Sequence, residues 1–187
     1  AVTVSAPAAW AATGTVLYNF GGGSDGESPQ GPVVFDSAGN LYGTTTFGGS
    51  GDGTAYKLTP SGSGWTKTTI HTFQPSNGRL PQGPLTLDGQ GNLYGTTYQG
   101  GASGLGTVFR LSPGAGGSWT QSVLFSFPGG NGGQLPTGGV TLDASGNIYG
   151  TTGGGGVWGQ GIAYKLSPNG GGWTQTVLHH FGSGTDG

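Results

Sequence analysis

A block of seven residues occurs three times in this chain of 187 residues, and this repetition limits the possible folds more than any other feature. The block reads Gly-Asn-Leu/Ile-Tyr-Gly-Thr-Thr, and its tyrosines are Tyr42, Tyr94 and Tyr149, spaced 52 and 55 residues apart. Self-similarity at such a period is typical of solenoids, propellers and arrays built from one supersecondary unit. The chain is therefore expected to consist of stacked copies of one unit.

Other residues recur around each block in the same order. Five positions repeat with it: a proline (Pro29, Pro81, Pro136), an aspartate (Asp36, Asp88, Asp143), a cation (Lys57, Arg110, Lys165), a second proline (Pro60, Pro113, Pro168) and a tryptophan (Trp65, Trp119, Trp173). A phenylalanine closes the pattern at Phe20, Phe73, Phe127 and Phe181. Three complete units are present, and an extra copy of the last segment precedes them at 16–20.

Each unit divides into four short apolar or alternating runs separated by Gly, Pro, Asn and Asp, which indicates strands joined by tight turns. In the second unit the runs are 84–88, 92–97, 107–111 and 119–127. Between the first two, Asp88 can cap the turn and Gly91 can supply a positive φ, so a hairpin is predicted. No run has the period of a helix. The chain is therefore predicted to be all-β.

Four-stranded meanders bury both faces only by stacking sheet on sheet, and about four to eight such sheets close into a ring. We predict a β-propeller-type array of three four-stranded blades plus one extra N-terminal strand. The expected segments are an N-terminal extension at 1–15, an array at 16–187 that begins with the strand 16–20, blades at about 29–73, 81–127 and 136–181, and a trailing linker at 182–187. Three blades do not close, so completion by other copies or by further sequence is expected.

The composition excludes several classes of function. Only 6% of residues are charged and the formal net charge is −2, so no basic surface is expected for nucleic acid. No apolar run is long enough to suggest membrane insertion. Without cysteine, neither a disulfide framework nor a thiolate zinc site can form. A Ser/Thr/Gly/Asn-rich, Lys-poor chain with an Ala-rich start is consistent with a processed, secreted protein.

Most carboxylates belong to the repeat and are therefore expected to shape turns. Asp36, Asp88 and Asp143 are predicted turn caps. Asp25 and Asp186 are aligned with Asn77 and Asn131 as turn residues that precede glycine. Glu27 and Asp52 remain; a glycosidase needs two carboxylates about 5 to 10 Å apart, and together with Asp25 they could bind calcium. Solvated loops are favoured over both, so no catalytic residue, metal or cofactor is predicted.

The recurring aromatic positions are interpreted as packing positions. Tyr42, Tyr94 and Tyr149 are expected to pack between blades with a partner for each hydroxyl. Trp65, Trp119 and Trp173 are expected in the blade core or at its outer edge. His71 and His179 occupy the position that holds Tyr18 and Phe125 elsewhere, so an aromatic packing role is favoured over metal binding. His180 is expected to be exposed.

The combined motif resembles a known group of repeats. Asp-x-x-Gly-Asn-Leu-Tyr-Gly-Thr-Thr followed by Gly-Thr-Val-Phe-Arg-Leu-Ser-Pro at 106–113 resembles NHL-like propeller repeats, and more closely the GloVer-type tandem repeats of bacterial surface and exported proteins. The resemblance covers 16–187. It implies an exported propeller-like protein and assigns no chemistry to the repeat.

The segments that vary between the units are candidates for recognition. The loop after the second strand and the linker before the first strand should emerge on the same rim. These segments carry the candidate ligand-binding residues Phe47, Tyr98, Trp158, Glu27 and Arg79. Aromatic faces beside polar groups suit sugar rings or a protein partner, and packing on a neighbouring blade or copy is an equal alternative.

These observations favour a non-enzymatic, exported or cell-surface structural or adhesive repeat protein. It is expected to self-associate into a homo-oligomer, as a ring or filament, through unmatched end strands. The candidate assembly residues are Val16, Leu17, Tyr18 and Phe20. The alternative is a glycan-binding propeller lectin with one weak site per blade. A glycan or a surface protein is a possible partner in either case.

Overall fold

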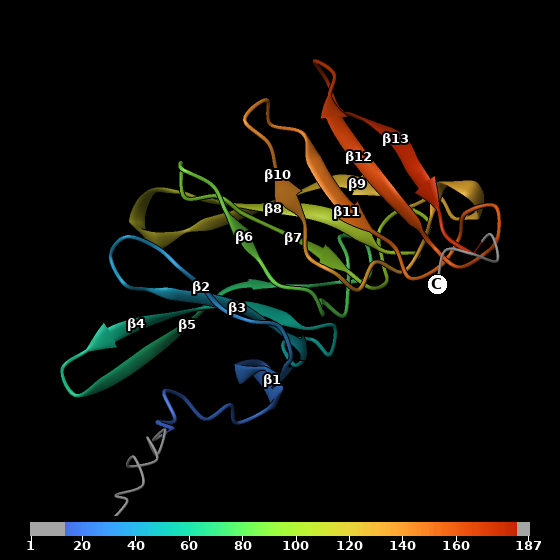
Figure 1. Cartoon of the computed structure of the whole chain (residues 1–187). Coiled ribbons are helices and arrows are strands. Elements are labelled where there is room, and N and C mark those ends of the chain that lie inside the picture. Colours follow the sequence, from blue (N-terminus) through green and yellow to red (C-terminus); the bar gives the residue numbers. More distant parts are fainter. Residues whose placement is uncertain (1–13, 183–187) are drawn as a thin grey trace, which may run out of the picture.

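The structure is a computed structural model that describes residues 14–182. Within this range the chain forms strands and three short 3-10 turns, η1 (Gly23–Asp25), η2 (Ala115–Gly117) and η3 (Gly130–Gly132), with no α-helix. No helix in the described range is long and apolar enough to cross a membrane. The strands form three antiparallel sheets, and Figure 1 shows them side by side in chain order.

Each sheet is one repeat unit, and the sheets are named blades 1 to 3. Blade 1 contains β1 (Glu27–Pro29), β2 (Val34–Phe35), β3 (Leu41–Phe47), β4 (Thr54–Ser61) and β5 (Gly64–Thr72). Blade 2 contains β6 (Thr86–Leu87), β7 (Leu93–Thr97), β8 (Thr107–Pro113) and β9 (Trp119–Ser126). Blade 3 contains β10 (Thr141–Leu142), β11 (Ile148–Thr151), β12 (Ile162–Pro168) and β13 (Trp173–His180). The predicted all-β, propeller-type array of four-stranded blades is confirmed.

Blade 1 has a fifth strand because its incoming linker pairs with β3, the first long strand of the blade. In β1, Glu27 lies opposite Phe47 of β3. The same pairing is reduced to single bridges in the other blades, Arg79 with Gln99 and Gln134 with Gly154. Each linker therefore pairs with residues at or just after the C-terminal end of β3, β7 or β11, where the loop to the next strand begins. The linkers and these loops consequently share one rim.

The prediction of an extra N-terminal strand at 16–20 is wrong, because these residues lie in no strand. A closing strand pairs with the strand that precedes it in its own blade, and in blade 1 this strand, β4, already pairs with β5. The segment has no such neighbour. Instead Tyr18 and Phe20 contact a cluster on the outer face of blade 1. The predicted extension 1–15 and linker 182–187 lie almost wholly outside the described residues.

The apolar core is divided between the blades. One cluster joins the inner face of blade 1 to blade 2, and a second joins blade 2 to blade 3. In each, the closing phenylalanine of one blade meets an aromatic ring of the next: Phe73 contacts Phe109 at 5.0 Å between centroids, and Phe127 contacts Tyr164 at 5.1 Å. Both phenylalanines are completely buried. Edge-to-face pairs contribute about 0.5–1.5 kcal/mol beyond the area that they bury.

The glycine of each Tyr-Gly-Thr-Thr block makes room for an aromatic ring from the next strand. Gly43, Gly95 and Gly150 lie directly opposite Tyr56, Phe109 and Tyr164. A Cβ at Gly150 would lie 2.5 Å from the Tyr164 hydroxyl. The ring covers the glycine, so the recurring block is explained by packing inside the blade.

A second set of glycines lies in the linkers before the first strand of each blade and lets the backbones of neighbouring linkers come close together. A Cβ on Gly83 would lie 2.6 Å from the backbone of Gly138 in the linker to blade 3. Backbone atoms cannot move aside as a flexible side chain can. Gly89, in the first turn of blade 2, has open space around the same position.

Replacement of Gly83 by alanine should therefore destabilise the protein by about 1–3 kcal/mol through overpacking. Gly89→Ala is the matched control and should be neutral or stabilising by about 0.4–1 kcal/mol. Urea unfolding followed by far-ultraviolet circular dichroism measures both. Equal stability of the two variants would contradict the close contact between blades.

The first turn of each blade is held by an aspartate that accepts four hydrogen bonds. In blade 3, Asp143 Oδ1 accepts from the backbone N–H groups of Ser145 and Asn147, both at 2.9 Å. Its Oδ2 accepts from the Asn147 side chain at 2.7 Å and from the Tyr149 hydroxyl at 3.0 Å. The same four bonds recur at Asp36 and Asp88. The motif Asp-x-x-Gly-Asn-x-Tyr is thus one hydrogen-bonded turn.

These bonds favour the ionised carboxylate. The bond from the Asn147 side chain lowers the pKa of Asp143 most. Burial acts to raise the pKa, but the bonds from the other donors lower it further, to about 2. At Asp36 burial acts to raise the pKa, but the bonds from Asn40 and Tyr42 outweigh it and the pKa is lowered. A folded-state pKa below the unfolded value, about 3.9 for Asp, gives stability that is present above pH 4 and lost as the pH falls through the folded pKa.

Asp143→Asn should therefore lower the thermal unfolding midpoint at pH 7, because the amide nitrogen that takes the place of Oδ2 cannot accept the bonds that Asn147 and Tyr149 donate there. The difference in midpoint between wild type and variant should shrink from about pH 4 to about pH 2. Calorimetry across this range measures it. A difference that stays constant down to pH 2 would show that the charge of Asp143 does not stabilise the turn.

Candidate functional site

The loops after β3, β7 and β11 and the linkers between blades form the rim on which recognition was predicted. Glu27 is exposed, and Phe47 opposite it has 43% of its surface exposed. Tyr98 is half-buried, and Trp158 is 57% exposed. Glu27 and Phe47 are the predicted ligand-binding residues that the strand pairing places directly opposite each other.

The three aromatic residues do not occupy equivalent positions. Counted from the buried threonines Thr45, Thr97 and Thr152 that close each block, Phe47 is the second residue, Tyr98 the first and Trp158 the sixth. Thr45 and Thr97 each bond the threonine that begins the next strand, at 2.7 and 2.8 Å, so the count starts from the same place in blades 1 and 2. The structure therefore does not repeat one aromatic site in every blade.

Arg79 joins two blades. Its Nε lies 2.9 Å from Oδ1 of Asp52 in the loop of blade 1, close enough for an ion pair although the N–H does not point along a hydrogen bond. The backbone carbonyl of Asp52 also accepts from Leu80 N–H at 2.8 Å, and Leu105 accepts from Leu135 N–H at 2.8 Å one blade later. Asp52 therefore belongs to a contact between blades. Within residues 14–182 no three His, Asp or Glu side chains are grouped to hold a metal ion.

Two of the three histidines, His71 and His179, lie at the packing positions. His71 contacts the ring of Phe73 at 4.8 Å and His179 that of Phe181 at 4.9 Å, as Tyr18 contacts Phe20. Burial lowers the pKa of His71, so the neutral imidazole is favoured at its site. His180 is half-buried rather than exposed, because its Nδ1 accepts the backbone N–H of Val157 at 3.3 Å.

The two outer faces of the array expose positions that are buried between blades. On blade 1, Val33 is 38% exposed, whereas its counterparts Leu85 and Val140 are 3% and 5% exposed. Phe35 beside it is 65% exposed. On blade 3, Leu178 is 53% exposed, whereas its counterpart Ile70 in blade 1 is 9% exposed. We name these the leading face of blade 1 and the trailing face of blade 3.

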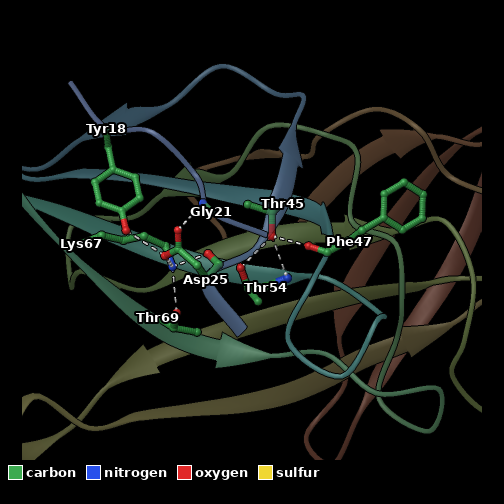
Figure 2. A network of polar contacts seen from close by, with 8 residues as sticks. All are labelled: Tyr18, Gly21, Asp25, Thr45, Phe47, Thr54, Lys67 and Thr69. Atoms are coloured by element: carbon green, nitrogen blue, oxygen red, sulfur yellow. Dashed lines mark hydrogen bonds and ion pairs between the residues drawn. The ribbon is translucent and has the colours of Figure 1, made fainter. Parts of the chain in front are cut away.

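The leading face is partly covered by the segment before blade 1. Figure 2 shows Asp25 at the centre of the contacts that hold it. The Tyr18 hydroxyl donates to Oδ1 at 2.8 Å, the Gly21 N–H to Oδ2 at 2.7 Å, and Lys67 Nζ lies 3.0 Å from Oδ1. The Gly21 bond is the largest cause of the lowered pKa of Asp25, with the Lys67 and Tyr18 bonds adding to it against some burial. We name Tyr18, Asp25 and Lys67 the clasp.

The clasp is peculiar to the first unit. Gln121 and Gln175 stand where Lys67 does, and their amides donate to the carbonyls of Asn77 and Gly132 at 2.9 Å. The second contact corrects the alignment, since Gly132, not Asn131, corresponds to Asp25. Lys67 and the outer-face residues were not among the predicted site residues. Lys67 could have been identified from the sequence, because the other units have glutamine at its position.

Comparison with known proteins agrees with the propeller architecture. A solved structure of a candidate gluconolactonase is similar, with 20% identity and a TM-score of 0.50 over 79% of this chain and 47% of that chain. At this identity the likeness shows the fold alone, and the chain spans about half the length of that protein. No curated protein matches the chain. The family model described as the Gloeobacter/Verrucomicrobia repeat matches residues 6–187. On this match over nearly its whole length, the chain belongs to the Gloeobacter/Verrucomicrobia repeat family.

Proposed function

We propose that this protein is a non-enzymatic, exported structural repeat protein that associates head to tail with further copies of itself. The observation that carries the proposal is the pair of outer faces. The leading face of blade 1 and the trailing face of blade 3 are the two halves of an interface that the chain already makes twice internally. Joining them would bury Phe35 and Leu178, now 65% and 53% exposed.

Complete burial of one large apolar side chain contributes about 1.5–3 kcal/mol, and Val33, Phe35 and Leu178 would each gain part of this. Exposed apolar side chains that gather on one face are typical of sites for protein association. The internal interfaces supply the geometry, because the same repeat positions face each other in both.

Backbone groups on the two faces also correspond. Leu80 and Leu135, which donate to the loop of the preceding blade, have φ values of 57° and 55°. Ser28 has the same unusual φ of 57° at the equivalent position of blade 1. Gln160 follows Trp158 at the position that supplies the acceptor in the other loops. A Ser28 N–H of one copy bonded to the Gln160 carbonyl of another would continue the series.

Head-to-tail contacts of this type either close into a ring or extend without limit. Two copies would contribute six blades, within the range of about four to eight found in closed propellers. We therefore propose a dimeric ring as the closed form and a filament as the open form.

We also propose that the protein is not an enzyme, and the structural roles of the described carboxylates support this proposal. Asp36, Asp88 and Asp143 hold turns, Asp25 is bound by Lys67, and Asp52 faces Arg79. Export is supported by the composition. We do not favour a lectin with one site per blade, because the rim aromatics differ in position from blade to blade.

The double substitution Phe35→Ser and Leu178→Ser should abolish association, since it places a hydroxyl in each half of the proposed interface. Phe47→Ser is the matched control, because Phe47 is 43% exposed on the rim and not on either face. Light scattering at increasing concentration should show a rising molar mass for the wild type and the control, and a constant monomer mass for the double variant. A monomeric wild type would overturn the proposal.

A further inference from the structure

Building on the proposed self-association, we propose that residues 16–25 form a displaceable latch over the leading face of blade 1. In the assembled state, the end of β13 in a second copy takes the place of this latch, with its Phe181 against Tyr56. The latch thus sets how readily copies join. Three features of the segment carry this inference: where Phe20 lies, how loosely the segment is held, and the clasp at its end.

Phe20 stands in for the closing phenylalanine of a preceding blade. Its ring meets Tyr56 at 4.9 Å and 64°. The internal pairs have nearly the same geometry, 5.0 Å and 63° for Phe73 with Phe109, and 5.1 Å and 69° for Phe127 with Tyr164. The receiving site on blade 1 is therefore formed and filled by a short segment instead of by a blade.

The trailing face presents the same aromatic pair ready for this site. His179 and Phe181 meet at 4.9 Å and 70°, and Tyr18 and Phe20 meet at 5.2 Å and 79°. The sequence after Phe181 also repeats the one after Phe20, with Asp186 at the position of Asp25, although Asp186 lies outside the described residues. An incoming copy therefore brings an aromatic pair and an aspartate in the order that the latch uses.

The latch fills the site less completely than a blade does. Residues 16–20 lie in no strand, and Val16 is 72% and Leu17 41% exposed. Phe20 is only half-buried, whereas Phe73 and Phe127 are completely buried. A segment without strand hydrogen bonds and with little buried area opens at low free-energy cost. A whole blade, which also covers Val33 and Phe35, should displace it.

The clasp opposes this displacement. Asp25 holds the segment through the Tyr18 hydroxyl at 2.8 Å, and Lys67 anchors Asp25 to β5. The Lys67 side chain is 4% exposed and its cation lies 5.7 Å from the centre of the Phe20 ring. The hydroxyl bond is made only by the segment before blade 1, because His71, Phe125 and His179 stand at the position of Tyr18 in blades 1, 2 and 3. The clasp therefore ties down the segment that occupies the docking site.

The test compares association of Phe20→Ala with that of the wild type by sedimentation equilibrium. Emptying the site should strengthen association by about tenfold, equivalent to about 1.4 kcal/mol. Leu17→Ala, in the same segment but outside the site, is the matched control and should leave association unchanged. Phe20→Ala combined with Phe181→Ala should lose the gain. Circular dichroism verifies that each variant is folded.

A second variant keeps the site filled. Tyr18→Phe, which introduces the residue that blade 2 has at this position, removes only the bond to Asp25 and should speed hydrogen exchange at residues 16–25. In the wild type, exchange at these residues should rise with protein concentration as copies displace the latch. If Phe20→Ala associates as well as the wild type or less well, while the wild type does associate, the latch is overturned and the proposed function stands. If neither associates, both are overturned.

Discussion

The packing of one sheet on the next is the constraint on which the rest of this structure depends. A four-stranded meander has two apolar faces and can bury them only against neighbouring sheets. The contact is most specific where Phe73 meets Phe109 and Phe127 meets Tyr164, because these phenylalanines close one blade and lie in the core of the next. Each blade is therefore complete only when another lies on both of its sides.

This constraint accounts for most of the residues that recur. The glycine of each block lies under the aromatic ring of the next strand, and the aspartate of each first turn binds a tyrosine of the following strand. Tyr42 in turn contacts Trp119 of the next blade at 5.8 Å. The recurring residues thus serve the architecture, and the residues that differ between the units are mainly those of the rim.

The strands, the blades and the aspartate turns could be predicted from the sequence, because each depends on alternation and turn residues within about 50 residues of chain. Gly91 has the expected positive φ of 85°. Residues 16–20 could not be predicted correctly, since their sequence matches a closing strand but a strand needs a neighbour with free hydrogen-bonding groups. The exposure of Phe35 and Leu178 could not be predicted from the sequence either, because these positions are apolar in every unit. Only the arrangement of the blades in space shows which of these positions lie on an outer face.

Site-specific photocrosslinking tests most directly whether the two outer faces are halves of one interface. With p-benzoylphenylalanine in place of Leu178 on the trailing face, irradiation of the associated protein should link two chains. Mass spectrometry should locate the second attachment point on the leading face of the partner, between residues 33 and 58. Links confined to a single chain, or to the rim of the partner, would contradict the account.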